Sequence, residues 1–339
     1  MRGKYRSIIL FTAVNIISIA CLIWALHGFN LRRLFYQTAH LDWRWVTVAI
    51  LSNVLMYVVQ AWRWSLVLAP VKPVPVWQSA RAIYIGLYAN EVLPLRSGEI
   101  IRCYLQALWS DIPISVALAS ALIERIFDGI WLIAAVFFAI ERVPLPRFIR
   151  TGGISLAAVV LVTAILLAIA MFWREQTLDA LLNAPRFSWV HTLIQDLHLI
   201  GHSRYLYFAF LVSLPCMLLQ MIPIYAVLQA SREVYRLPVM ASFALMLALR
   251  LNSALPQAPG NVGTFQIVAS RGLMRFNVVR DIALDISFIL WGIVTLPLVA
   301  VGFIVVALTG LKIGEIHRDA RSSVRDREIV PEDNPALKE

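Results

Sequence analysis

The sequence predicts an all-α polytopic membrane protein, with about six spanning helices and two broken helices that enter the membrane and turn back. Three observations support this fold class. The 339 residues are 60% hydrophobic and 15% charged, whereas soluble domains are about 45–50% apolar and about 25% charged. The apolar residues form runs of the length that crosses a bilayer, about 20 residues. A helix-breaking pattern, N-x-x-L-P-x-x-x-G, occurs twice, beginning at Asn90 and at Asn252.

Six runs are long and apolar enough to be spans. Four of them contain no Lys, Arg, Asp or Glu: 7–29, 151–173, 205–231 and 286–311. The run 45–69 is interrupted only by Arg63, and the run 112–140 only by the charged residues of "IERIFDGI". The first run follows a basic segment, as a signal peptide does, but it is too long for an h-region and has no A-x-A-like cleavage site. We therefore expect it to be an uncleaved first helix.

The charge distribution indicates a lipid environment and no nucleic acid partner. The net charge is +10, but the segment 312–339 holds six basic and seven acidic residues and is not a basic arm. The surplus lies in the helices and short loops, where Lys and Arg attract anionic lipid headgroups. We expect 312–339 to be a disordered cytoplasmic tail. Basic residues near both ends favour cytoplasmic termini.

The two copies of the pattern indicate two repeats within a single transmembrane domain, 1–311. The Asn, Leu, Pro and Gly of the first copy recur after a constant offset of 162 residues (252 − 90 and 260 − 98). The first repeat covers about 7–140 and the second about 151–311. Because each contains three spans, an odd number, the second is expected to be inverted in the membrane. Paired interrupted helices in two halves are the best sequence indication of a transporter's binding site.

The helix breaks predict a cavity. Proline removes a backbone donor, and glycine permits the backbone angles of a tight reversal. Non-helical backbone at membrane depth is tolerated only where protein buries it or a wet cavity adjoins it. The residues assigned to the breaks are Pro94, Gly98, Pro256, Pro259, Gly260 and Gly263.

Charged residues within spans are expensive and usually functional. Glu124 and Asp128 are four residues apart and share a helix face, and Arg125 is close enough in sequence to pair with Asp128. Arg96 and Arg102 are expected to neutralise the remaining negative charge. The cluster is either a network that binds a charged headgroup and a coupling ion, or an ion-paired structural lock between helices.

A phosphate site is predicted beside the breaks. A helix end offers free N–H groups, and the planar fork of arginine matches phosphate. The alternative for these arginines is interfacial snorkelling. Arg63 lies between two tryptophans, which favours the membrane interface. The residues assigned to substrate binding are Asn90, Arg96, Glu99, Arg102, Arg250, Asn252, Asn261 and Gln266.

No metal, cofactor or catalytic motif is indicated. His198 and His202 are four residues apart, but no further ligands accompany them. The three cysteines show no CxxC spacing, so we expect neither a disulfide framework nor a metal site. No nucleophile elbow, P-loop or dinucleotide motif is present.

The segments "NEVLPLRSGEIIRCYL", "ALIERIFDGI" and "LPQAPGNVGTFQ", in this order, resemble the lysylphosphatidylglycerol synthase transmembrane-region family. This flippase-like family includes the membrane half of the multiple peptide resistance factor. The resemblance covers roughly 7–311 and implies movement of a lipid between leaflets, with lipid synthesis left to a separate domain. We expect no such domain after residue 311. Many relatives have an acidic residue where this chain has Gln266, which leaves the charge of the cargo open.

Three functions follow from these observations. The leading hypothesis is a lipid translocase for a phospholipid or another lipid with an anionic or phosphate headgroup. The second is an accessory subunit that presents a lipid carrier, a polyprenyl phosphate or a hopanoid, to a separately encoded glycosyltransferase or other envelope enzyme, a role that the resemblance implies. The third is a membrane-embedded enzyme that uses Glu124 and Asp128 as acid and base.

Overall fold

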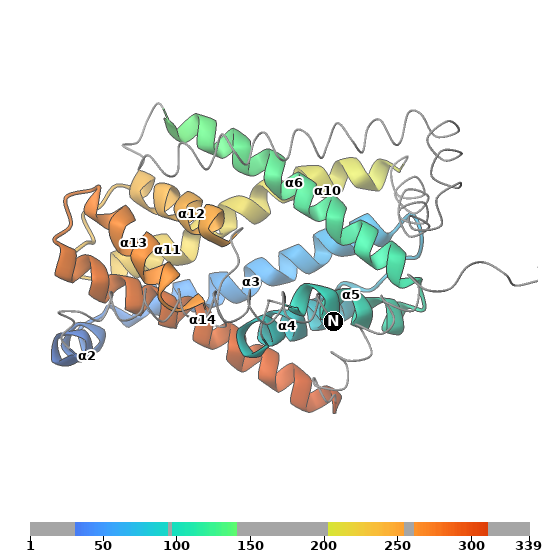
Figure 1. The fold of residues 1–339 in the computed structure, drawn as a ribbon, viewed down its shortest axis with the longest axis horizontal. Coiled ribbons are helices and arrows are strands. Elements are labelled where there is room, and N and C mark those ends of the chain that lie inside the picture. The colour runs from blue at the N-terminus through green and yellow to red at the C-terminus, as the bar shows by residue number, and fades with distance from the viewer. Residues whose placement is uncertain (1–30, 94–96, 141–202, 254–260, 311–339) are drawn as a thin grey trace, which may run out of the picture.

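The structure, a computed structural model, describes residues 31–93, 97–140, 203–253 and 261–310. Every regular element within these residues is a helix (Figure 1). The predicted spans 7–29 and 151–173 and the predicted tail lie outside the described residues, as do His198 and His202. The same is true of Pro94, Arg96, Pro256, Pro259 and Gly260.

Among the described residues, three helical stretches are long and apolar enough to cross a membrane. They are α3 (Trp43–Leu68), the consecutive pair α10 (Arg204–Leu219) and α11 (Met221–Ala230), and α14 (Arg280–Thr309). Helix α6 (Ile114–Ile140) is as long, at 27 residues, but carries three charged residues in its middle. These stretches correspond to the predicted runs 45–69, 205–231, 286–311 and 112–140.

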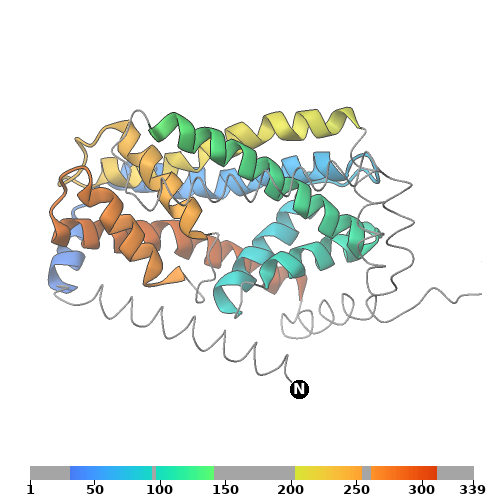
Figure 2. The ribbon, with the colours of Figure 1, turned by 45° about the horizontal axis from the view of Figure 1, so that its top comes forward.

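The two predicted broken helices are observed as helical hairpins. In the first half, α4 (Val76–Val92) ends just before the break and α5 (Gly98–Ser110) begins just after it. In the second half, α12 (Val239–Ser253) precedes the break and α13 (Thr264–Met274) follows it. In each hairpin the two helices pack against each other, and Figure 2 shows the hairpins on opposite sides of the molecule. The short helix α2 (Leu31–Ala39) packs against the start of α14.

A close glycine contact holds the first hairpin together. A Cβ added at Gly98 would lie 1.9 Å from the carbonyl oxygen of Gly86, so the two backbones meet at a distance that only glycine permits. The Gly98 N–H, one of the donors left unpaired at a helix start, donates to Asn90 Oδ1 at 2.8 Å. The break in the helix is therefore closed by residues of the repeated pattern itself.

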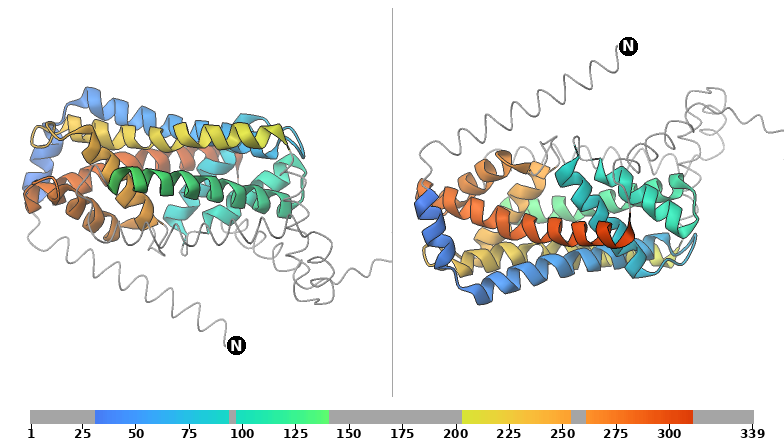
Figure 3. Two further views of the ribbon diagram at one scale, coloured as in Figure 1. Left: turned by 90° about the horizontal axis from the view of Figure 1, so that it is seen from above. Right: turned by 90° about the horizontal axis from the view of Figure 1, so that it is seen from below.

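The hairpin of each half packs against the last long helix of the other half. Helix α14 of the second half packs on α4 of the first, where the backbone at Gly302 approaches Tyr88. Helix α6 of the first half packs on α12 of the second through an edge-to-face contact of Phe138 with Phe243, with ring centroids 6.0 Å apart. Helix α3 runs beside α10 and α11 (Figure 3). Each half thus stabilises the hairpin of the other.

The described residues form two hydrophobic clusters. One contains the end of α3, both helices of the first hairpin, the start of α6 and the end of α14. The other contains the start of α3, the end of α6, both helices of the second hairpin and the start of α14. Residues of both clusters line the cavity of the candidate site, among them Tyr57 and Leu87, which pack on the first, and Met246 and Leu290 of the second.

We predict that Gly98→Ala destabilises the protein, because the new methyl group would meet the Gly86 carbonyl and lie 2.7 Å from Asn90 Oδ1. The expected cost is at the upper end of the overpacking range, about 1–3 kcal/mol. The thermal midpoint of the detergent-solubilised protein measures it. Gly292→Ala is the matched control, since the nearest atom to its new Cβ is Leu296 Cδ1 at 3.9 Å. Equal midpoints for the two variants would contradict the role given to Gly98.

Candidate functional site

Six charged side chains from α3, α5 and α6 form a closed loop of alternating charge, which we call the ion-pair ring. Each carboxylate lies between two arginines, and each arginine lies between two carboxylates. Three positive and three negative charges therefore cancel within the ring. In order around the loop, the members are Arg63, Glu124, Arg102, Glu99, Arg125 and Asp128.

The buried part of the ring is centred on Glu124. Its two carboxylate oxygens accept from Arg63 and Arg102, each at 3.1 Å. The side chains of Arg63 and Glu124 are both 1% exposed, and that of Arg102 is 4% exposed. Buried charges are tolerated when they are paired and hydrogen-bonded, and this arrangement meets that condition for all three groups.

The accessible part of the ring consists of Glu99, Arg125 and Asp128. Arg102 pairs with Glu99 at 3.0 Å, Arg125 pairs directly with Glu99, and Arg63 pairs directly with Asp128. The Arg125–Asp128 contact is the loosest, at 4.0 Å. The side chains of Glu99 and Arg125 are 43% and 49% exposed, so this part of the ring can be reached from outside it.

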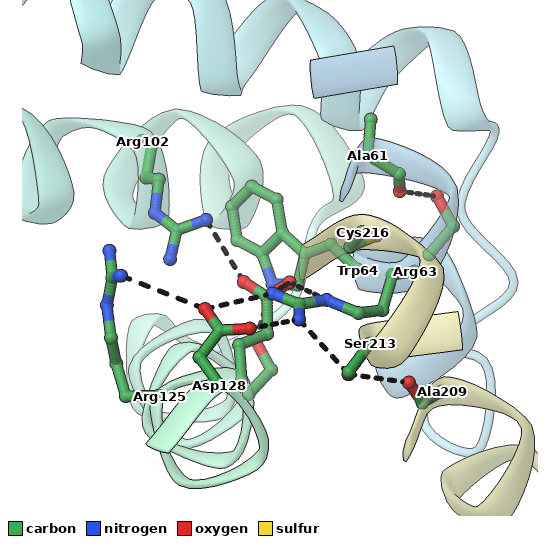
Figure 4. Close-up of polar contacts among 12 residues, drawn as sticks. Ala61, Arg63, Trp64, Arg102, Arg125, Asp128, Ala209, Ser213 and Cys216 are labelled. Atoms are coloured by element: carbon green, nitrogen blue, oxygen red, sulfur yellow. Dashed lines mark hydrogen bonds and ion pairs between the residues drawn. The ribbon is translucent and has the colours of Figure 1, made fainter. Parts of the chain in front are cut away.

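Neighbouring side chains fix the buried part of the ring. The Trp64 indole donates to Ser120 Oγ at 2.8 Å, and the guanidinium of Arg102 lies over the same indole, 4.7 Å from the ring centroid. Ser213 of α10 accepts from Arg63 at 3.1 Å. Figure 4 shows Arg63, Arg102 and Arg125 converging from three different helices. The ring thereby joins α3, α5, α6 and α10.

A cavity of about 270 Å³ lies beside the accessible part of the ring, and we call it the central cavity. It is lined by the last turns of the helices that precede both breaks, through Leu87 and Asn90 of α4 and Arg250 and Asn252 of α12. Asn261, which follows the second break, also lines it. The two broken helices therefore end at one shared cavity, as the sequence predicted.

The walls of the central cavity differ in character. The first half contributes Arg63, the three accessible ring residues and six uncharged side chains, which are Asn53, Met56, Tyr57, Gln60, Leu87 and Asn90. The second half contributes apolar side chains from four helices, together with Arg250 and a few amide and hydroxyl groups. The apolar lining residues of the second half are Pro223, Ile224, Met246, Leu249, Phe265, Leu290 and Val294. The cavity is thus amphipathic.

Two of the predicted binding amides cap helices. Asn90 lines the cavity, but its Oδ1 is engaged by the Gly98 N–H. Gln266 is fully buried, does not line the cavity, and accepts from the Gly263 N–H at 2.7 Å. Gly263 has φ of +94°, a conformation that favours glycine. Arg102 and Glu124 also lie outside the lining, behind the accessible part of the ring.

The interfacial assignment of Arg63 is wrong. Its guanidinium is buried and bonded to Glu124, Asp128 and Ser213. The flanking tryptophans suggested the membrane surface, but only Trp62 is exposed, while Trp64 is buried in the core. The signal that would have identified Arg63 was its isolation, since it is the one charge in the run 45–69 and an ionisable residue within a span is functional by default.

The neutralisation of Glu124 by Arg102 is confirmed. The sequence assigned the remaining neutralisation to Arg96, which lies outside the described residues, whereas in the structure Arg63 supplies it. Among the described residues, no group of three or more His, Cys, Asp and Glu side chains is arranged to hold a metal ion.

Comparison with known families identifies the family of the chain. The sequence model described as the lysylphosphatidylglycerol synthase TM region matches residues 10–302. The chain belongs to this family. The match covers all the described helices except the end of α14, and it makes the chain a lipid-related membrane protein. Comparisons with curated proteins and with solved structures gave no match.

We predict that Glu124→Gln strongly destabilises the protein, because it leaves Arg63 and Arg102 without their shared buried counter-ion. Removing one partner of a buried pair costs about 3–5 kcal/mol. Glu99→Gln removes a carboxylate from the same ring, but that side chain is 43% exposed and the expected cost is about 0–1 kcal/mol. Denaturant titration followed by tryptophan fluorescence measures both. Equal losses would show that the ring is not anchored at Glu124.

Proposed function

We propose that the protein is a lipid translocase, which moves a lipid with an anionic or phosphate-bearing headgroup between the leaflets of a bacterial cytoplasmic membrane. The observation that carries this proposal is the central cavity, where two broken helices end inside a bundle of long apolar helices. Family membership supports a lipid as the cargo. We propose a transporter without a chemical step, because each ring carboxylate is already bonded to arginines of the same ring.

The proposed architecture has six spans and two inverted repeats, with both termini in the cytoplasm. Three features of the described residues support it. The pattern N-x-x-L-P-x-x-x-G recurs at the same place in each half. A hairpin of two helices surrounds each break. The last long helix of each half packs on the hairpin of the other, as a two-fold relation would require.

The size and polarity of the central cavity suit a headgroup better than a whole lipid. Its volume of about 270 Å³ lies below the range of about 300–1,000 Å³ for sites that enclose a drug-sized ligand. We propose that the headgroup enters the cavity while the acyl chains stay in the surrounding lipid. The two halves then alternate access by rocking against each other, as in other transporters built from repeats. A separately encoded enzyme would supply or modify the lipid.

Reconstitution tests the proposal. The protein is placed in liposomes that contain a phospholipid with a fluorescent acyl chain, and dithionite quenches the label in the outer leaflet. Translocation should let the quenching continue beyond the outer-leaflet fraction, whereas protein-free liposomes keep their inner-leaflet signal. If proteoliposomes and empty liposomes quench to the same extent for every labelled lipid tried, the translocase proposal is wrong.

We predict that Val294→Trp reduces transport by about tenfold or more, because the indole fills the wall of the central cavity on α14. Ile304→Trp is the matched control, since it introduces the same side chain on the same helix at a position that is 54% exposed on the outer surface. The dithionite assay compares the two at equal protein content. Normal transport by a stably folded Val294→Trp protein would show that the cargo takes another route.

A further inference from the structure

One cation of the central cavity stands outside the ion-pair ring. The ring contributes no net charge, because its three arginines and three carboxylates cancel. Arg250, in the last turn of α12, lines the same cavity. Among the described residues its guanidinium has no hydrogen bond or ion pair. The described residues of the ring and the cavity lining therefore carry a net charge of +1.

The described lining of the central cavity offers Arg250 no uncommitted counter-ion. The carboxylates in the cavity lining are those of Glu99 and Asp128. Asp128 is near enough to Arg250 to attract it, but it is already bonded to Arg63 and contacts Arg125. Glu99 is held by Arg102 and Arg125. Of the two breaks, the segment 254–260 contains no charged residue and 94–96 contains only a further arginine.

An isolated charge inside a membrane protein is costly and marks a functional site. The attraction to Asp128 lowers that cost only in part, because Asp128 is shared with Arg63 and Arg125. The neighbouring wall includes apolar side chains such as Met246, Leu249 and Leu290. A bound anion would supply the missing charge. The planar guanidinium fork also matches the oxygens of a phosphate group.

We infer that the cargo is a phosphodiester lipid with one net negative charge, and that Arg250 binds its phosphate. This inference rests on the proposed translocase function. It excludes the cationic aminoacylated lipids, because their extra ammonium group would enter a cavity whose carboxylates are all paired and whose net charge is already positive. Arg250 is then the residue that selects the charge of the cargo.

The experiment compares three lipids that share one fluorescent acyl chain and differ in headgroup charge. Phosphatidylglycerol carries one negative charge, phosphatidylethanolamine is zwitterionic, and lysyl-phosphatidylglycerol carries one net positive charge. In the dithionite assay, we expect phosphatidylglycerol to move faster than either of the others by about tenfold or more. All three lipids carry the phosphodiester that Arg250 binds, but the other two add an ammonium group, which finds no unpaired carboxylate in the cavity lining. Equal rates, or faster movement of the cationic lipid, would overturn the inference and leave the translocase function standing. Movement of none of the three would instead overturn the proposed function.

Two substitutions at Arg250 test the assignment. Arg250→Gln should lower the rate for phosphatidylglycerol to that of the zwitterionic lipid. Arg250→Glu changes the net charge of the ring and this residue from +1 to −1, and should reverse the preference toward the cationic lipid. Arg236→Gln is the control, because that arginine is exposed and contacts Tyr235. Since Arg250 has no ion pair with any residue that the structure describes, its variants should keep the thermal midpoint. An unchanged selectivity ratio in folded Arg250→Glu would overturn the assignment.

A soluble phosphodiester could supply the same anionic group. Glycerophosphoglycerol, the headgroup of phosphatidylglycerol without its acyl chains, distinguishes the two sources. We expect phosphatidylglycerol in detergent micelles to raise the thermal midpoint of the wild-type protein, and not that of Arg250→Gln, at concentrations where glycerophosphoglycerol has no effect. Equal stabilisation by the two compounds would show that the site binds a soluble phosphodiester, and would overturn the inference of a lipid cargo.

Discussion

The rest of the structure depends on the burial of the Glu124 carboxylate between two arginines from different helices. Arg63 comes from α3 and Arg102 from α5, and each lies 3.1 Å from one oxygen of the carboxylate. The hydrophobic clusters on either side consist largely of aliphatic side chains, which tolerate some sliding of helices. A buried ion pair does not, because a displaced partner leaves an unpaired charge. The ring therefore sets the register in which the broken helix α5 meets α3 and α6.

Much of the fold could be predicted because its signals are local. The long apolar runs and the two breaks are readable from composition and from Pro and Gly positions, and α4 and α12 end where the pattern indicates. The partners within the site could not be read in this way. Arg63 and Glu124 are 61 residues apart, and no local feature of "QAWRWS" distinguishes a buried arginine from an interfacial one. That difference is decided by which helices pack together.

The structure also changes the meaning of the repeated pattern. Asn90 was expected to bind cargo, but its Oδ1 closes the helix break at Gly98, so the shared Asn and Gly of the first copy stabilise the break itself. Gln266 acts similarly at Gly263. The six charges of the ring, in contrast, all come from the first half. The second half adds Arg250 to the cavity lining and otherwise lines it with uncharged side chains. This asymmetry explains why most of the charge of the cavity lies on one wall.

The asymmetry also limits how the cavity can open. The ring joins α3, α5 and α6, and the Arg63–Ser213 hydrogen bond adds α10. Parting any of these helices at the ring would expose or unpair buried charges, which is expensive in a membrane. The apolar wall of α12, α13 and α14 has no such penalty, and a hydrogen bond from Asn53 to the Val294 carbonyl, at 2.7 Å, crosses the boundary. If the protein is the proposed translocase, the least costly opening lies between the ring helices and that wall, which carries Arg250. A cargo bound to Arg250 would then move with α12, α13 and α14 while the ring stays closed.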